Sequence, residues 1–109
     1  MTYYAVAMHH PDGDGWGQHV GAHVSYLEGL IVAGKLKASG PIKGDRLRGG
    51  LLIFHVADRD EVLRLVESDP FSKAGLIESI SVTEWDPIFG AFRAESSAAT
   101  SPANSATIR

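Results

Sequence analysis

The first third of the chain shows a strand-like and then a helix-like pattern of hydrophobic positions. Residues 2–9 (TYYAVAMH) are β-branched, aromatic or small and contain no breaker, so they are predicted to form a buried strand. Residues 11–17 (PDGDGWG) follow as a loop rich in Pro, Asp and Gly. The next apolar residues recur with the period of a helix at Val20, Val24, Leu27 and Ile31. Gly34 is expected to end this helix, because glycine readily adopts the left-handed conformation that follows a helix.

Two further strands are predicted in the middle of the chain. Residues 36–42 (LKASGPI) form the first of them, which ends at a Gly-Pro step. Residues 43–50 (KGDRLRGG) are a charged, glycine-rich turn, and residues 51–57 (LLIFHVA) have the strongest strand pattern in the sequence. The middle of the chain is therefore predicted to be two strands joined by a turn.

A second helix and a fourth strand are predicted to follow. Asp58 is a favourable N-cap residue, and Glu61 three positions later completes a pattern like a capping box. The apolar stripe of this helix consists of Val62, Leu65 and Val66. After a turn at residues 69–71 (DPF), residues 77–85 (IESISVTEW) alternate between apolar and polar positions, as a strand does.

The order of these elements, strand–helix–strand–strand–helix–strand, predicts an α+β fold, the ferredoxin-like βαββαβ sandwich. Two helices cover one face of such a sheet. The strands at residues 2–9 and 51–57 are apolar on both sides, which indicates that both faces are buried. A second copy packed sheet to sheet is the simplest cover for the other face. We therefore expect a homodimer or a higher homo-oligomer, with a pocket between sheet and helices.

The C-terminal residues differ in composition from the rest of the chain. Residues 88–93 (IFGAFR) could extend over a partner subunit. Residues 94–109 (AESSAATSPANSATIR) are rich in Ala, Ser and Thr and show no hydrophobic period. They are not expected to bury enough surface to offset their ordering entropy. We expect one α+β domain over residues 1–93 and a disordered tail over residues 94–109.

Length, composition and charge narrow the class of protein. The chain of 109 residues fits one domain, and its 44% hydrophobic and 21% charged residues are ordinary for a soluble globular protein. A net charge of −3 gives no basic face for nucleic acid or an anionic membrane. There is no cysteine for a disulfide or a thiolate metal site, and no apolar run long enough to span a membrane. The sequence starts without a signal-peptide pattern, so we expect a cytoplasmic protein.

His23 on the first predicted helix and Asp69 after the second are the candidates for catalysis. If the fold brings them together, the carboxylate fixes the imidazole tautomer and prepares the ring to act as a general base near neutral pH. Asp69 also precedes Pro70, and aspartate is a favourable N-cap before a proline at the first helical position. The alternative is therefore a purely structural cap, with His23 as a partly buried polar residue.

Four histidines offer a different hypothesis, a metal site. His19 and His23 lie four residues apart on one helix face, which is a spacing used by metal ligands, and His9 and His10 end the first strand. The sequence has no HExxH motif, and exposed histidines near a loop explain the same pattern. Our main hypothesis includes no metal and no other cofactor.

Further residues are candidates for contacts with a small-molecule ligand. Arg46 or Arg48 could hold a carboxylate with its guanidinium fork, although a charged turn between strands explains both residues as well. Trp16 could close the mouth of the pocket, or it could fasten its loop to the core. Tyr26, one turn beyond His23, could supply a hydroxyl group.

Several short motifs, in this order, resemble the YciI-like family of the dimeric α+β barrel superfamily. The motifs are His23 with Leu27 and Leu30, Gly34, Ala38-Ser39-Gly40-Pro41, Asp69-Pro70-Phe71, Ala74-Gly75-Leu76 and Trp85. The resemblance covers residues 2–87 and implies a ferredoxin-like fold, a dimer, and a pocket that holds His23 and Asp69 and is lined by Ser39 and Gly40. The chain has His19 where members often carry a basic residue, and Tyr26 where they often carry a second histidine.

The resemblance also implies an activity, because one member is a dehydrochlorinase for a chlorinated hydroxyquinol and some resemble muconolactone isomerases in fold. We therefore expect a small cofactor-free enzyme in which His23 and Asp69 move a proton during isomerisation or elimination. Ser39 or a nearby backbone amide would steady an oxyanion. The substrate would be a small, cyclic, oxygenated molecule. Two alternatives stay open: a non-catalytic domain for small-molecule binding or assembly, and a metal-binding protein based on the histidine cluster.

Overall fold

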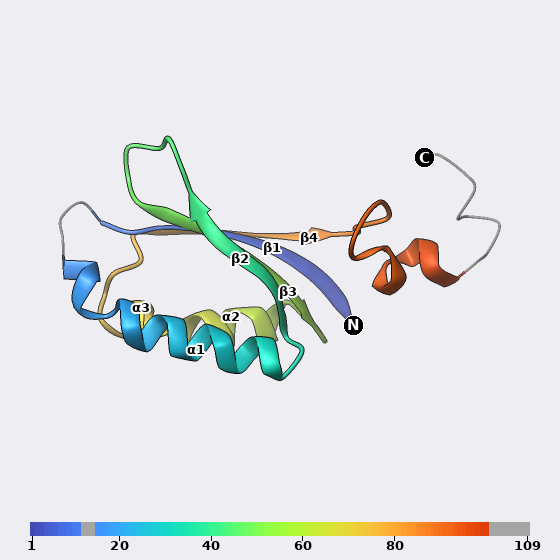
Figure 1. Ribbon diagram of the computed structural model, residues 1–109, viewed down its shortest axis with the longest axis horizontal. Coiled ribbons are helices and arrows are strands. Elements are labelled where there is room, and N and C mark those ends of the chain that lie inside the picture. The colour runs from blue at the N-terminus through green and yellow to red at the C-terminus, as the bar shows by residue number, and fades with distance from the viewer. Residues whose placement is uncertain (12–14, 101–109) are drawn as a thin grey trace.

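The protein forms one antiparallel sheet with its main helices on one side (Figure 1). The computed structural model describes residues 1–11 and 15–100. The strands are β1 (Thr2–His9), β2 (Leu36–Ile42), β3 (Gly49–Val56) and β4 (Ser79–Trp85), in the spatial order β2-β3-β1-β4. The helices are α1 (Val20–Val32), α2 (Arg59–Glu67) and the short α3 (Pro70–Lys73), and a 3-10 turn, η1 (Gly15–Gln18), precedes α1. This order of elements confirms the predicted ferredoxin-like α+β sandwich.

The register of the central strand decides which side chains face the helices. β1 pairs antiparallel with β3 on one side and with β4 on the other. Tyr4 lies opposite Phe54, and Val6 lies opposite Leu52. Because side chains alternate along a strand, these residues share one face, and their sequence neighbours share the other.

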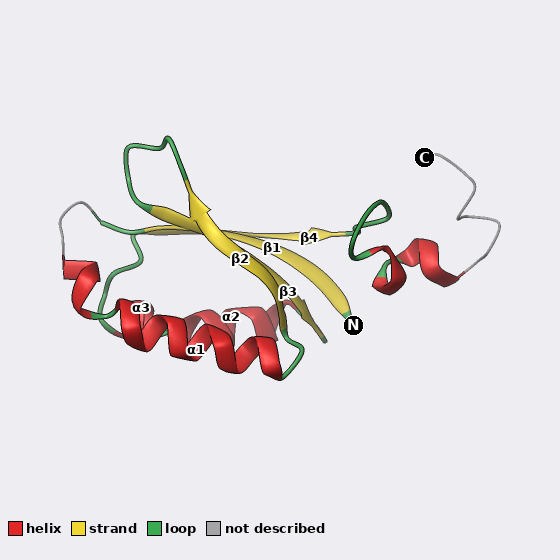
Figure 2. Cartoon of the chain, in the orientation of Figure 1, coloured by secondary structure: helices red, strands yellow, loops and turns green. Residues whose placement is uncertain are grey.

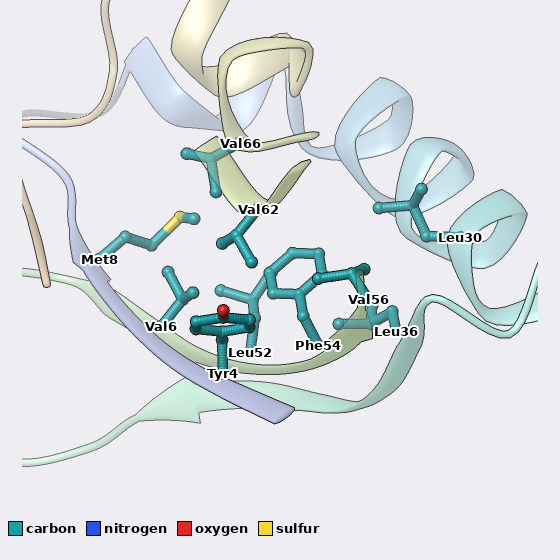
Figure 3. Packing of buried hydrophobic residues seen from close by; sticks show 10 residues of the cluster. All are labelled: Tyr4, Val6, Met8, Leu30, Leu36, Leu52, Phe54, Val56, Val62 and Val66. Atoms are coloured by element: carbon teal, nitrogen blue, oxygen red, sulfur yellow. The ribbon is translucent and has the colours of Figure 1, made fainter. Parts of the chain in front are cut away.

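The core fills the space between this face and the helices. Figure 2 shows α1 and α2 as one layer beneath the sheet. In Figure 3, Val62 and Val66 of α2 lie across from Val6 and Phe54 of the sheet, while Leu30 comes from α1. Burying a side chain of this size contributes about 1.5–3 kcal/mol, so this layer is the main source of stability.

Local signals in the sequence define the ends of both main helices. Gly34 follows α1 with a φ of 77°, the left-handed conformation predicted for it. Asp58 accepts a hydrogen bond from the Glu61 amide at 2.9 Å, and the Glu61 carboxylate accepts one from the Ala57 amide at 3.0 Å. The reciprocal cap expected at α2 is therefore present, with Ala57 as its second backbone donor. Within the described residues, no helix combines the length and the apolar character that a membrane crossing requires.

None of α1, α2 and α3 lies on the opposite face of the sheet, where Tyr3 and His55 at one end contact residues 92–95 after β4. Here Ala5 lies opposite Ile53, and Ala7 lies opposite Leu51. Leu51 is 42% exposed, although it belongs to the strand with the strongest hydrophobic pattern. A sheet surface of small and apolar side chains is the kind of surface that a second sheet can cover.

The chain after β4 continues as two 3-10 turns at the end of the sheet, drawn in orange and red in Figure 1. These are η2 (Arg93–Glu95) and η3 (Ser97–Thr100). Ser96 and Ala98 are buried, although the composition of this segment predicts a disordered tail from residue 94. The rest of the predicted tail, residues 101–109, lies outside the described residues.

Glu95 links the segment after residue 93 to the sheet. Its carboxylate accepts a hydrogen bond from the Tyr3 hydroxyl at 2.8 Å, and it pairs with Lys37 at 3.0 Å and His55 at 3.1 Å. Hydrogen bonds from Lys37 and Tyr3 lower the pKa of Glu95, and burial together with the Glu95 contact raises the pKa of Tyr3. A specific charged contact thus holds a segment that has no hydrophobic period.

Candidate active site

A cavity of about 430 Å³ lies between α1 and the helix side of the sheet. Its apolar wall includes Met8, Val20, Val24, Leu27, Ile31 and Leu52. Most of these residues belong to the apolar stripe predicted for α1. Val24 and Ile31 stay 44% and 52% exposed, so part of this stripe faces the cavity rather than the core. An apolar wall left open in this way is suited to a small apolar ligand.

His23 of α1 and Asp69 meet at this cavity. Nδ1 of His23 lies 2.9 Å from both carboxylate oxygens of Asp69. The side chain of His23 is 16% exposed and that of Asp69 is 2% exposed, so the carboxylate is shielded from water and the imidazole lies between it and the cavity. A shielded carboxylate interacts more strongly with a charged imidazole than an exposed one does.

Asp69 also caps α3. It accepts a hydrogen bond from the Phe71 amide at 2.9 Å, and Pro70 occupies the start of this short helix. The two interpretations of Asp69, cap and imidazole partner, therefore describe the same side chain. A cap of this kind contributes about 1 kcal/mol, and it fixes the carboxylate in the position from which it reaches His23.

The contact with Asp69 determines which nitrogen of His23 is available. An ionised carboxylate only accepts hydrogen bonds, so Nδ1 carries the hydrogen and donates it. Nε2 of the neutral ring then presents a lone pair. Phe71 stacks on the His23 ring at 4.1 Å between centroids and limits its rotation. The arrangement has the parts that a general base needs.

Arg48 and Trp16 line the cavity together, as a cation packed on an aromatic ring. The Arg48 guanidinium lies 3.7 Å from the centroid of the Trp16 ring, which is cation–π geometry. Both residues line the cavity, and Arg46 is not among its lining residues. Arg48 places its guanidinium at the cavity, and a guanidinium fork is suited to hold an anionic group of a ligand.

Ser39 and Gly40 of β2 line the same cavity, as the resemblance implies. Ser39 lies opposite Leu52 in the sheet, on the face toward the helices. Gly49 at the start of β3 lines the cavity nearby, and a Cβ at this position would lie 2.6 Å from the Met8 carbonyl oxygen. The sheet can approach so closely only because this residue is glycine.

Tyr26 lies away from the cavity. It is not among the lining residues, and its hydroxyl donates a hydrogen bond to the Leu65 carbonyl at 2.6 Å. Burial raises its pKa, and the negative charge of Asp69 adds to this effect. Tyr26 therefore ties α1 to α2 in this structure, and we leave it out of the set of ligand-binding candidates.

The four histidines of the metal hypothesis do not converge. His9 points to the far face of the sheet and pairs with Asp45 at 3.0 Å, whereas the His10 ring bonds to the Leu76 carbonyl. Among the residues that the structure describes, no three His, Cys, Asp or Glu side chains are placed to hold a metal ion. The metal-binding alternative therefore has no support in the arrangement of these side chains.

His10 is the one cavity residue with a chemically active side chain that the sequence analysis did not assign to the pocket. It follows β1 directly, and the period of two along Tyr4, Val6 and Met8 would have placed it on the core face. Extending the strand pattern by one residue would have found it.

Comparisons with known proteins agree with this fold and identify a family. The model of the YCII-related domain family matches residues 1–86. The structure of 5-chloro-2-hydroxyhydroquinone dehydrochlorinase from Burkholderia phenoliruptrix AC1100, in complex with 2,5-dihydroxybenzoquinone, matches with a TM-score of 0.67 and 30% identity. That match covers 76% of this chain and 92% of the dehydrochlorinase.

A dimeric ferredoxin-like protein of unknown function from Jannaschia sp. CCS1 matches with a TM-score of 0.46 and 18% identity, over 79% of this chain and 99% of its own. No match was found among the curated proteins.

Proposed function

The chain belongs to the YCII-related domain family, and we propose that it is a small enzyme that uses His23 and Asp69 to move a proton. The reaction is an isomerisation or an elimination on a small, cyclic, oxygenated molecule. The observation that carries the proposal is the hydrogen-bonding contact of His23 Nδ1 with both carboxylate oxygens of Asp69. It lies at the wall of a cavity of about 430 Å³. A cavity of this size holds a substituted six-membered ring.

The two members of the pair have different roles in this proposal. Nε2 of His23 removes a proton from the substrate, and the ring becomes an imidazolium. Asp69 stabilises that cation and keeps Nδ1 as the hydrogen-bond donor, since its carboxylate is 2% exposed and has little competing solvent. Phe71 keeps the ring in place through its stacking contact.

Other lining residues bind and orient the substrate. The apolar wall from α1 takes the body of the ring, and Trp16 provides an aromatic surface at the mouth. Arg48 offers its charge to an oxyanion or a carboxylate, and Ser39 offers a hydroxyl to a developing oxyanion. Gly40 leaves room beside Ser39, because nothing lies within 4 Å of the position where its Cβ would be.

Similarity to the Burkholderia dehydrochlorinase supports the substrate class. That enzyme is named for 5-chloro-2-hydroxyhydroquinone, and its structure holds 2,5-dihydroxybenzoquinone. Both molecules are small hydroxylated rings, which match the size and the apolar wall of the cavity. We therefore propose a hydroxylated, chlorinated or otherwise substituted ring as the substrate of this chain.

A homodimer is part of the same proposal. The part of the sheet face with Ala5, Leu51 and Ile53 lies opposite the layer of α1 and α2, and a second copy would bury it sheet to sheet. Sedimentation of the full chain would give its mass in solution. A monomer at micromolar concentration would contradict this part of the proposal without touching the pocket.

The central experiment measures chloride release from 5-chloro-2-hydroxyhydroquinone under anaerobic conditions. Wild type is compared with Asp69→Asn and with Asp58→Asn, a control in the cap of α2. We expect release by wild type and by the control, and a loss of about a hundredfold or more in Asp69→Asn. Equal rates in all three proteins would contradict the catalytic proposal. Ring binding without turnover by wild type would favour the alternative of a non-catalytic binding domain.

A further inference from the structure

A second imidazole lies in the same cavity as His23. His10 follows the end of β1, is 6% exposed and lines the cavity. Its ring is 4.8 Å from the Phe71 centroid in an edge arrangement, while His23 stacks on the same phenyl ring at 4.1 Å. One aromatic side chain therefore orients two imidazoles that open into one cavity.

The hydrogen bond of His10 fixes which nitrogen is free. Nδ1 lies 2.6 Å from the Leu76 carbonyl oxygen, and a carbonyl only accepts hydrogen bonds, so Nδ1 carries the hydrogen. Nε2 of the neutral ring is then the basic nitrogen. Within the described part of the chain, every fully buried side-chain nitrogen or oxygen has a hydrogen-bond partner. Nε2 of His10 makes no hydrogen bond to these residues, so it is not one of the fully buried atoms. Nε2 is therefore open to the cavity.

The two imidazoles share this tautomer but differ in what supports them. His23 donates its Nδ1 hydrogen to the buried Asp69 carboxylate. His10 donates to a neutral carbonyl, and the other charged or titratable groups that line its cavity are His23 and Arg48. Two proton carriers with different electrostatic support suit a reaction in which one gives a proton while the other takes one.

We propose that His10 is a second acid–base residue, which exchanges a proton with a hydroxyl group of the substrate while His23 exchanges one with a ring carbon. This inference rests on the proposed function, since it adds a second group to the same site. It names the substrate class more closely: a ring that carries a hydroxyl group conjugated with the carbon that reacts.

The step is a keto–enol conversion, and its atoms and charges balance. Nε2 of neutral His10 takes the hydroxyl proton, and the O–H electron pair forms the C=O bond. The ring π pair then forms a C–H bond with the proton that the His23 imidazolium donates. His10 ends as imidazolium and His23 as neutral imidazole, so the net charge of the site is unchanged. The same two transfers in reverse order convert the ketone back to the hydroxylated ring.

The test follows the exchange of ring hydrogens in 1,2,4-trihydroxybenzene, kept anaerobic in D₂O, by proton NMR. Ketonisation in D₂O places a deuterium on the ring carbon beside its original hydrogen. When the released ketone enolises again in solution and loses that original hydrogen, the ring retains the deuterium, so the assay needs no chloride and no net reaction. His10→Asn is the informative variant, because the asparagine amide can still donate to the Leu76 carbonyl but carries no basic nitrogen. His19→Asn is the matched control, since His19 does not line the cavity.

We expect His10→Asn to lower kcat for exchange by about a hundredfold or more with KM changed less than about threefold. The pH profile of wild type should fall on both sides of its optimum, and the variant should lose one of these limbs. The control should keep the rate and the profile of wild type.

Exchange by His10→Asn within threefold of wild type would overturn the role of His10 and leave the proposed function standing. If wild type itself does not accelerate exchange above the rate in buffer, the proposed function fails, and the inference fails with it. If His10→Asn does not fold, the wild-type profile decides, because a single-limbed profile would also overturn the inference.

Discussion

Asp69 binds His23 through both carboxylate oxygens at 2.9 Å while its Oδ1 also accepts the Phe71 amide at 2.9 Å. One side chain therefore starts α3 and orients the imidazole that faces the cavity. The hydrogen bond from the α3 backbone already fixes the carboxylate. The Asp69 side chain therefore loses less conformational entropy when it binds His23 than a freely rotating aspartate would. Structural and chemical roles are joined here, but substitutions can separate them.

Replacement of Asp69 by Asn and by Ala should separate the cap from the proton transfer. Asn caps a helix about as well as Asp, so Asp69→Asn should keep the cap, whereas Asp69→Ala should lower the free energy of unfolding by about a further 1 kcal/mol. Both variants should lose catalysis to a similar degree, since neither carries the charge that supports the imidazolium. Urea unfolding and the chloride-release rate measure the two effects. Equal stability of the two variants would contradict the capping role.

Gly49 and Gly50 allow a test of the close approach beside the cavity. A Cβ on Gly49 would lie 2.6 Å from the Met8 carbonyl, whereas a Cβ on Gly50 would lie 3.6 Å from its nearest neighbour, the Gly40 carbonyl. Gly49→Ala should therefore lower the free energy of unfolding by about 1–3 kcal/mol through overpacking against backbone. Gly50→Ala, the control, should change it little. Denaturant titration of both variants gives the comparison, and equal midpoints would show that the strands can move apart without strain.

Glu95 should make the docking of the C-terminal segment depend on pH. The hydrogen bonds from Lys37 and Tyr3 lower its folded-state pKa below the ordinary value of 4.5. The stabilisation is therefore present above pH 4.5 and is lost as the pH falls through the lowered pKa of Glu95. Urea unfolding at pH 7 and at about pH 3 should show a smaller loss of stability in Glu95→Gln than in wild type.

Glu67→Gln is the control for this prediction, because Glu67 is exposed and makes no ion pair with another described residue. It should lose stability with falling pH to the same extent as wild type. An acid-induced loss in Glu95→Gln as large as that of wild type would mean that other carboxylates govern the response.

The fold was predictable because its signals are local. The breaker-free strand pattern of residues 2–9, the cap at Asp58 and the stop at Gly34 each depend on a few neighbouring residues, and the structure contains all three. The C-terminal segment was not predictable in the same way. Glu95 is held by Tyr3 at the opposite end of the sequence, and no window of composition reports such a contact.

The site was predictable only in part for a related reason. His23 and Asp69 could be named from their types and from a resemblance, but the stripe of α1 that includes Val24 reads the same whether it faces a core or a cavity. Tyr26 illustrates the limit. It lies one turn from His23 in sequence, yet rotation around the helix directs its hydroxyl to Leu65 instead of the cavity.

Arg48 should determine the affinity for an anionic ring. Its guanidinium lies 3.7 Å from the Trp16 centroid at the cavity, and the cation makes no ion pair with a described residue. Arg48→Gln should therefore weaken binding of 2,5-dihydroxybenzoquinone by about tenfold at low salt, since it removes a charge-assisted contact worth roughly 1.5 kcal/mol. The control Arg64→Gln removes an exposed arginine on α2 and should leave the affinity unchanged. Calorimetric titration measures both values.

Raising the salt concentration should reduce the difference in affinity between wild type and Arg48→Gln, because dissolved ions screen an exposed charge. If the two arginine variants bind the ring equally well, the anionic group does not contact Arg48 and the apolar wall alone accounts for affinity.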